Sequence, residues 1–214
     1  MESHVLHIIS SGKQTLARVK TIIHSIHPYL DVFQIREKQQ TARTLMAWAQ
    51  TLLAEGLPAS KLSMNDRLDV GLAVRAGHIH LAYHSLPPSE AKPLLFPGQK
   101  LGVSVHDVKE AELAEENGAD FLYFGHVYPT HSKPGMAPRG IHALEKVVHS
   151  VSIPVIALGG ITLEKVYDIL ATGCAGLAVM SAVMKAENPE ATIMAFRREM
   201  DKVTVHPVRI QKHI

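Results

Sequence analysis

Short apolar runs alternate with longer amphipathic segments from one end of this sequence to the other. The apolar runs are five to seven residues long, are rich in β-branched and aromatic residues, and contain few polar positions. This pattern is typical of parallel strands that are buried on both faces. We predict strands at 5–10, 32–36, 61–65, 78–83, 101–105, 121–127, 155–159 and 177–181.

The amphipathic segments predict helices at 14–25, 41–55, 66–75, 88–95, 107–117, 140–149, 162–171 and 189–203. Terminal signals support two of them, because Asp107 and Thr162 can cap helix starts while Gly118 and Gly173 can end helices. Eight strand–helix units predict an α/β fold with a single (β/α)8 TIM barrel over residues 1–205 and a short C-terminal tail at 206–214. An open doubly wound sheet is the alternative, because periodicity does not show whether a sheet closes.

Composition narrows the class of partner. The 214 residues are 46% apolar and 20% charged, with a net charge of +2, so we expect neither nucleic acid nor a membrane surface as a partner. The apolar runs are far shorter than the ~20 residues that span a bilayer. Cys174 is the one cysteine, and the N-terminal segment lacks the features of a signal peptide. We expect a cytoplasmic protein.

Polar side chains gather where the predicted strands end, which in a barrel is the mouth of the active site. Gly159 and Gly160 precede a helix and leave backbone N–H groups open to an anion, and Ser181 follows the last strand. These three residues predict a phosphate site. The alternative is that the two glycines only turn the chain.

The ends of the second and third strands carry further candidates. Arg36 and Lys38 could bind an anion, or could form a surface ion-pair cluster with the intervening Glu37. Asn65 and Asp66 could bind Mg²⁺, although Asp66 is also a good helix cap.

Histidines stand out at two places. His78 and His80 lie on one strand face and could bind zinc, but no third ligand follows, so we expect them to be packing residues. His126 ends an apolar strand directly before a loop rich in proline and glycine. It suits proton transfer near pH 7, with a hydrogen-bonded core histidine as the alternative.

Seven motifs occur in a fixed order along the chain: QIREK, NDR, HIHLA, GVSVH, GHVYPTHSK, IPVIALGGI and AGLAVMSAV. With them the chain resembles thiamine phosphate synthases and their TenI-type relatives over roughly residues 5–200. The resemblance implies a thiamine-pathway barrel whose site takes phosphorylated thiazole and pyrimidine compounds.

Two departures separate the branches of that family. The synthase motif after the fourth strand reads like HLGQED and ends in a metal-binding Asp, whereas Ser85 stands at that position here. The synthase motif GPxFPTxTK has proline after its glycine, whereas this chain has His126. In both respects the sequence looks like the TenI-type proteins, which are thiazole tautomerases.

The resemblance therefore implies an isomerase that converts the non-aromatic carboxythiazole phosphate into its aromatic tautomer, with His126 as the general base. It implies no cofactor and no metal, and a homodimer as the family's assembly. We expect the substrate to contact Arg36, Lys38, Asn65, Ser104, Thr130, Ser132, Lys133, Gly159, Gly160, Met180 and Ser181. One alternative is a thiamine phosphate synthase with altered metal ligation, and another is a non-catalytic regulatory or binding protein.

Overall fold

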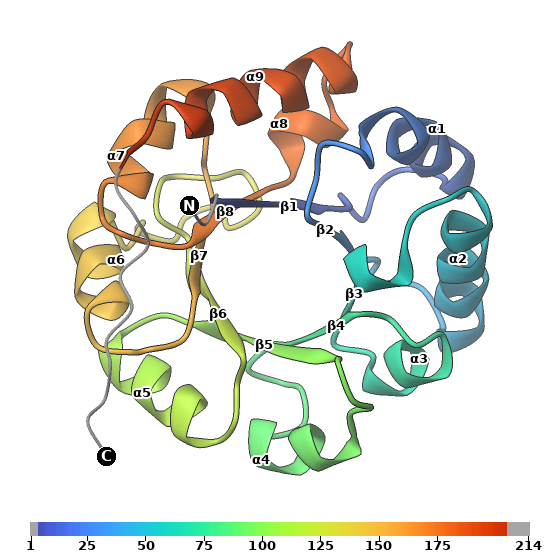
Figure 1. The fold of residues 1–214 in the computed structure, drawn as a ribbon, viewed down its shortest axis with the longest axis horizontal. Helices are drawn as coiled ribbons and strands as arrows, with labels where there is room; N and C mark the ends of the chain where they lie inside the picture. Colours follow the sequence, from blue (N-terminus) through green and yellow to red (C-terminus); the bar gives the residue numbers. More distant parts are fainter. Residues whose placement is uncertain (1–3, 205–214) are drawn as a thin grey trace.

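The computed structural model describes residues 4–204, and the eight strands in this part of the chain form one closed parallel barrel. Neighbouring strands pair in sequence order, and β1 pairs with β8 to close the ring. Figure 1 shows the strands as the inner ring and the helices outside them. The strands are β1 (Val5–Ile9), β2 (Val32–Ile35), β3 (Leu62–Asn65), β4 (His78–Leu81), β5 (Lys100–Val105), β6 (Phe121–Gly125), β7 (Val155–Leu158) and β8 (Gly176–Val179).

This closure confirms the predicted (β/α)8 TIM barrel, and the open-sheet alternative is wrong. The predicted tail at 206–214 lies outside the described residues, so the barrel boundary stays a prediction. No helix within residues 4–204 is long and apolar enough to cross a membrane. The helices are α1 (Leu16–Ile26), α2 (Ala42–Ala54), α3 (Leu68–Ala73), α4 (Pro88–Ala91), α5 (Val108–Glu116), α6 (Ile141–Val148), α7 (Val166–Leu170), α8 (Ser181–Met184) and α9 (Pro189–Asp201).

Apolar side chains pack on both sides of the barrel wall. Successive strand residues point to opposite faces, so Leu122 and Phe124 join the large cluster against the helices. Phe121 and Tyr123 instead belong to a small cluster inside the barrel, which also holds Ile156. Tyr123 also lines the cavity that is described below, so this interior cluster lies next to it.

The helix ends follow local chemistry. The Asp107 side chain accepts a hydrogen bond from the Glu110 amide at 2.8 Å and caps α5, as predicted. The predicted cap at Asp66 is wrong, because α3 begins after Arg67 and has no side-chain cap. The helix predicted at 88–95 divides into α4 and a 3₁₀ turn, Lys92–Leu94, where Pro93 lacks an amide N–H.

The short helix α8 and the 3₁₀ turn Ala59–Lys61 were not predicted, and the turn Leu163–Lys165 was predicted as α-helix. They are single turns, too short to give a periodic apolar pattern. The last of them forms the first turn of the helix predicted at 162–171, and α7 completes it.

Candidate active site

A cavity of about 580 Å³ opens at the carboxyl ends of the strands. That size suits a small phosphate ester. The residues predicted from the strand ends all line it. They are Arg36, Lys38, Asn65, Ser104, His126, Thr130, Ser132, Lys133, Gly159, Gly160, Met180 and Ser181.

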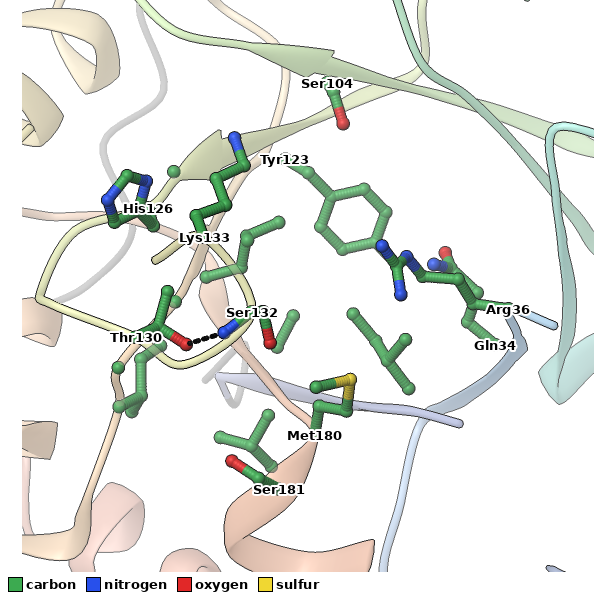
Figure 2. A pocket seen from close by; sticks show the side chains of 18 of the residues that line it. Gln34, Arg36, Ser104, Tyr123, His126, Thr130, Ser132, Lys133, Met180 and Ser181 are labelled. Atoms are coloured by element: carbon green, nitrogen blue, oxygen red, sulfur yellow. Dashed lines mark hydrogen bonds between the residues drawn. The ribbon is translucent and has the colours of Figure 1, made fainter. Parts of the chain in front are cut away.

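Figure 2 shows how these side chains divide around the cavity. Arg36 lies on one side, and His126, Thr130 and Lys133 lie on the other. Ser181 stands apart from both groups, beside Met180. A ligand in this cavity is therefore surrounded by cations and a histidine on two flanks and by a serine on a third.

His126 follows β6 and is 1% exposed. Its Nε2 lies 3.2 Å from the carbonyl oxygen of Met136. A carbonyl oxygen only accepts, so Nε2 carries the proton and Nδ1 holds the lone pair of the neutral ring. Among the described residues Nδ1 has no hydrogen-bond partner. The ring therefore lies beside the cavity with one nitrogen that is buried and has no hydrogen-bond partner.

The backbone beside His126 requires glycine. A side chain at Gly159 would bring its Cβ within 2.3 Å of the His126 Cβ. At Gly160 a Cβ would lie 2.4 Å from the Pro129 carbonyl oxygen, and both glycines have positive φ. The two glycines thus allow the β7 end to approach the β6 loop closely, in addition to any role toward an anion.

Ser181 also lines the cavity, as the exposed first residue of α8. Lys165 also lines the cavity and was missed from the sequence. Its ammonium donates to the Gly160 carbonyl oxygen at 3.0 Å and lies 4.3 Å from the centre of the Tyr128 ring. The GGI motif gave no signal for this lysine, since it comes five residues after Gly160 in a helical turn.

Arg36 and Lys38 form a cationic part of the cavity lining. Burial lowers the pKa of the Arg36 guanidinium, and the nearby Glu37 opposes that shift. The Glu37 carboxylate accepts a hydrogen bond from the Gly12 amide at 3.1 Å. No ion pair found within residues 4–204 joins Glu37 to Arg36 or Lys38. The alternative of an ion-pair cluster with Glu37 is therefore not found in this part of the chain, and both cations remain available to an anion.

Lys133 reaches the cavity from the loop between β6 and α6. Burial lowers the pKa of its ammonium, and Arg139, Lys38 and Arg36 lower it further. An ammonium crowded by other cations favours the arrival of an anion, which relieves the repulsion.

The cavity floor contains polar residues that we did not predict as site residues. His80 Nε2 lies 2.8 Å from the Ser104 hydroxyl oxygen, and its ring packs against Tyr123 at a tilt of 60°, with centroids 4.4 Å apart. Burial, reinforced by Arg36, lowers the pKa of His80 to about 3. Gln34 is fully buried, and its Nε2 has no partner among the described residues. The QIREK and HIHLA motifs contained both residues, but their strand positions did not show that they face the cavity.

Asp66 is engaged by the protein on both carboxylate oxygens. The Ser85 hydroxyl donates to Oδ1 at 2.6 Å, and His84 Nε2 lies 3.1 Å from Oδ2. Within residues 4–204 no group of three or more His, Cys, Asp or Glu could hold a metal ion. One carboxylate already paired with a serine and a histidine is a poor fit for Mg²⁺ bound to a pyrophosphate, because that ion needs free oxygen ligands.

Comparison with known proteins identifies the relatives of this chain. The family model described as thiamine monophosphate synthase (TMP-TENI) matches residues 5–183. A thiamine-phosphate synthase of Chlorobium luteolum is 42% identical over 75% of this chain and 76% of its own length. A protein named thiamine-phosphate synthase 2, from Streptococcus pneumoniae, is 36% identical over 90% of this chain and 91% of its own.

The fold comparison agrees with the sequence comparison. The structure of a thiamine phosphate pyrophosphorylase from Pyrococcus furiosus matches with a TM-score of 0.79 and 31% identity. The superposition covers 95% of this chain and 98% of the Pyrococcus furiosus chain. With a family model matching most of the chain and relatives well above 30% identity, the protein belongs to the thiamine monophosphate synthase (TMP-TENI) family of thiamine-biosynthesis enzymes.

Proposed function

We propose that the protein is the thiazole tautomerase of its family, an isomerase that converts the non-aromatic carboxythiazole phosphate into the aromatic tautomer. The observation that carries this proposal is His126, a buried imidazole that lines the cavity and whose Nδ1 has no partner among the described residues. Proton transfer is what such a group does well near neutral pH. The engaged Asp66 carboxylate supports the same branch, because it leaves little for a pyrophosphate-bound metal.

The reaction needs one proton removed and one added. His126 takes the proton from the ring carbon that bears the carboxylate, and the electron pair of that C–H bond moves into the ring. The exocyclic double bond becomes a single bond, and its outer carbon gains a proton, which the protonated His126 returns. The product ring is aromatic, so the reaction is downhill and the protein has to move protons and hold the ester.

The two flanks of the cavity suit the two anionic groups of this substrate. Gly159, Gly160 and Ser181 bind the phosphate in this proposal, with Lys165 close to the same end. Arg36, Lys38 and Lys133 receive the carboxylate and stabilise the charge that develops when the ring carbon loses its proton. Asn65, Ser104, Thr130, Ser132 and Met180 contact the ring from the remaining sides.

A second candidate function is thiamine phosphate synthase. It is favoured by the names of the relatives, since those of Chlorobium luteolum and Streptococcus pneumoniae are called thiamine-phosphate synthases. In this alternative the cavity would hold a thiazole phosphate and a pyrimidine pyrophosphate together. The site of Asp66 and Ser85 argues against it.

One experiment separates the two. Purified protein is incubated with the thiazole tautomer, and aromatisation is followed by ultraviolet absorption or NMR, with and without EDTA. A parallel sample receives thiazole phosphate, pyrimidine pyrophosphate and Mg²⁺ and is assayed for coupling. We expect aromatisation that survives EDTA and negligible coupling. Mg²⁺-dependent coupling without aromatisation would establish the synthase instead.

We further propose a homodimer, on the family resemblance stated above. Light scattering coupled to size-exclusion chromatography measures the mass directly. A monomer mass across the accessible concentration range would remove this part of the proposal.

A further inference from the structure

Three side chains form a hydrogen-bonded series at the rim of the cavity. Glu110 of α5 accepts from both the backbone amide and the ring of His106, through the same oxygen, Oε2, at 2.7 and 3.0 Å. The other ring nitrogen of His106, Nε2, lies 3.4 Å from the Lys133 ammonium. The series therefore runs from a carboxylate on a helix, through an imidazole after β5, to a cation in the β6–α6 loop.

The chemistry of the two end groups fixes the tautomer of the middle one. A carboxylate only accepts, so His106 Nδ1 must carry the proton, and an ammonium only donates, so Nε2 must hold the lone pair. This tautomer is the opposite of the one that Met136 imposes on His126. Both nitrogens of His106 are occupied, which makes it unsuitable as the proton carrier.

The cation at the end of the series needs an anchor. Lys133 lies among Arg139, Lys38 and Arg36, each of which disfavours a charged ammonium there. Its loop side chain would gain by swinging into solvent, because both repulsion and desolvation fall away from the cavity. The lone pair of His106 is the side-chain acceptor that the structure gives Lys133 within residues 4–204.

We infer that His106 and Glu110 are positioning residues, which hold the Lys133 ammonium at the cavity so that it meets the carboxylate of the substrate. The inference rests on the proposed function for the identity of that carboxylate. Glu110 sets the tautomer, His106 supplies the acceptor, and Lys133 alone touches the ligand. His106 and Glu110 thereby gain a role, although neither belongs to the site residues predicted from the sequence.

A double-mutant cycle tests whether His106 acts through Lys133. Removing the acceptor with His106→Leu should lower kcat/KM for the thiazole tautomer by about 10-fold, the size expected when a charge-assisted contact is lost. Lys133→Ala should lower it at least as much, and the double variant should match Lys133→Ala alone. His106→Gln keeps an acceptor and should restore much of the loss. If the two losses multiply, His106 does not act through Lys133 and the inference is overturned.

A spectroscopic measurement keeps the test independent of the reaction. The ring ¹⁵N resonances of His106, assigned by comparison with His106→Leu, should report the neutral Nδ1–H tautomer in the ligand-free protein. Glu110→Ala should abolish that preference, whereas Glu112→Ala, an exposed position on the same helix, should leave it intact. The Lys133 ammonium resonance should move in His106→Leu and stay in place in Glu112→Ala.

The two readouts assign a failure to one claim or the other. An Nε2–H tautomer at His106, or an unmoved Lys133 resonance in His106→Leu, would overturn the positioning inference whatever the protein catalyses. The expected tautomer and shift in a protein that does not aromatise the thiazole would instead overturn the proposed function and leave the positioning series established.

Discussion

The histidines inside the barrel and those at its mouth are the same side chain in two surroundings. His7 is 4% exposed, and its Nδ1 lies 2.7 Å from the Tyr123 hydroxyl below the cavity. His126 is buried to the same degree, but its Nδ1 has no partner among the described residues and it borders open space. Burial alone therefore does not distinguish a packing histidine from a candidate base. His126 differs from His7 in its unpartnered Nδ1 and in lining the cavity, and His80 shares both features.

The interior histidines are built to stay neutral. His7 packs edge-on against Phe121 and Tyr123, with ring centroids 5.9 and 5.6 Å away. Burial, together with smaller contributions from His78, His80 and Arg197, lowers its pKa to about 3. At the mouth of the barrel the cavity is instead lined by cations, Arg36, Lys38 and Lys133, which can bind an anion. The comparison predicts that changes inside alter stability and that changes at the mouth alter turnover.

The largest effect should come from His126. Replacing it by glutamine keeps much of the size and polarity but removes the base, so turnover of the thiazole tautomer should fall by about 100-fold, or roughly 2.7 kcal/mol of transition-state stabilisation. Phosphate affinity and the unfolding midpoint should change little. His142→Gln, at an exposed histidine on α6, is the matched control and should behave as wild type. Normal turnover in His126→Gln would make His126 a packing residue like His7.

The next effect concerns the phosphate flank. Gly160 is a poor place to test it, because any Cβ would collide with the Pro129 carbonyl oxygen. Ser181→Asp adds a negative charge at an exposed position and should weaken binding of inorganic phosphate or the phosphate ester by about 10-fold or more. Titration calorimetry measures this, with Ser89→Asp on α4 as the charge-matched control. Equal affinity in the two variants would place the phosphate elsewhere in the cavity.

The histidines inside the barrel should make the free energy of unfolding depend on pH. His7, His80 and His78 have pKa values lowered mainly by burial, to about 3, 3 and 4. Their stabilising contribution is complete above the unfolded value of about 6.5 and is lost as pH falls toward the folded values. Between about pH 6 and 4 each should cost about 1 kcal/mol per pH unit. Denaturant titrations should show a shallower slope for His7→Gln and an unchanged one for His142→Gln.

The sequence predicted most of the fold and of the cavity lining, but not all of it. The apolar runs predicted all eight strands, and strand ends such as Arg36 and Ser181 predicted cavity residues, because barrel strands share one functional edge. Closure of the barrel, and the pairing of Asp66 with Ser85 in place of the predicted helix cap, depend on contacts between segments that are distant in the sequence. Lys165 was missed because a lysine one helical turn past a glycine pair has no local signal.

The smallest change in stability and turnover should come from replacing His78, a histidine inside the barrel. Its ring packs against Phe121 at a centroid distance of 5.8 Å, and its Nδ1 has no hydrogen-bond partner among residues 4–204. Leucine is close to histidine in size and lacks the unpartnered Nδ1, but it also loses the hydrogen bond between the ring and the Leu62 backbone. His78→Leu should therefore change the free energy of unfolding by only about 1 kcal/mol. It should also remove one proton from the acid-unfolding slope and leave turnover unchanged. Chemical denaturation measures the first two quantities, and the aromatisation assay measures the third.

A large loss of turnover in His78→Leu, with stability preserved, would show that the interior histidines take part in proton transfer. The division between the barrel interior and its mouth would then fail.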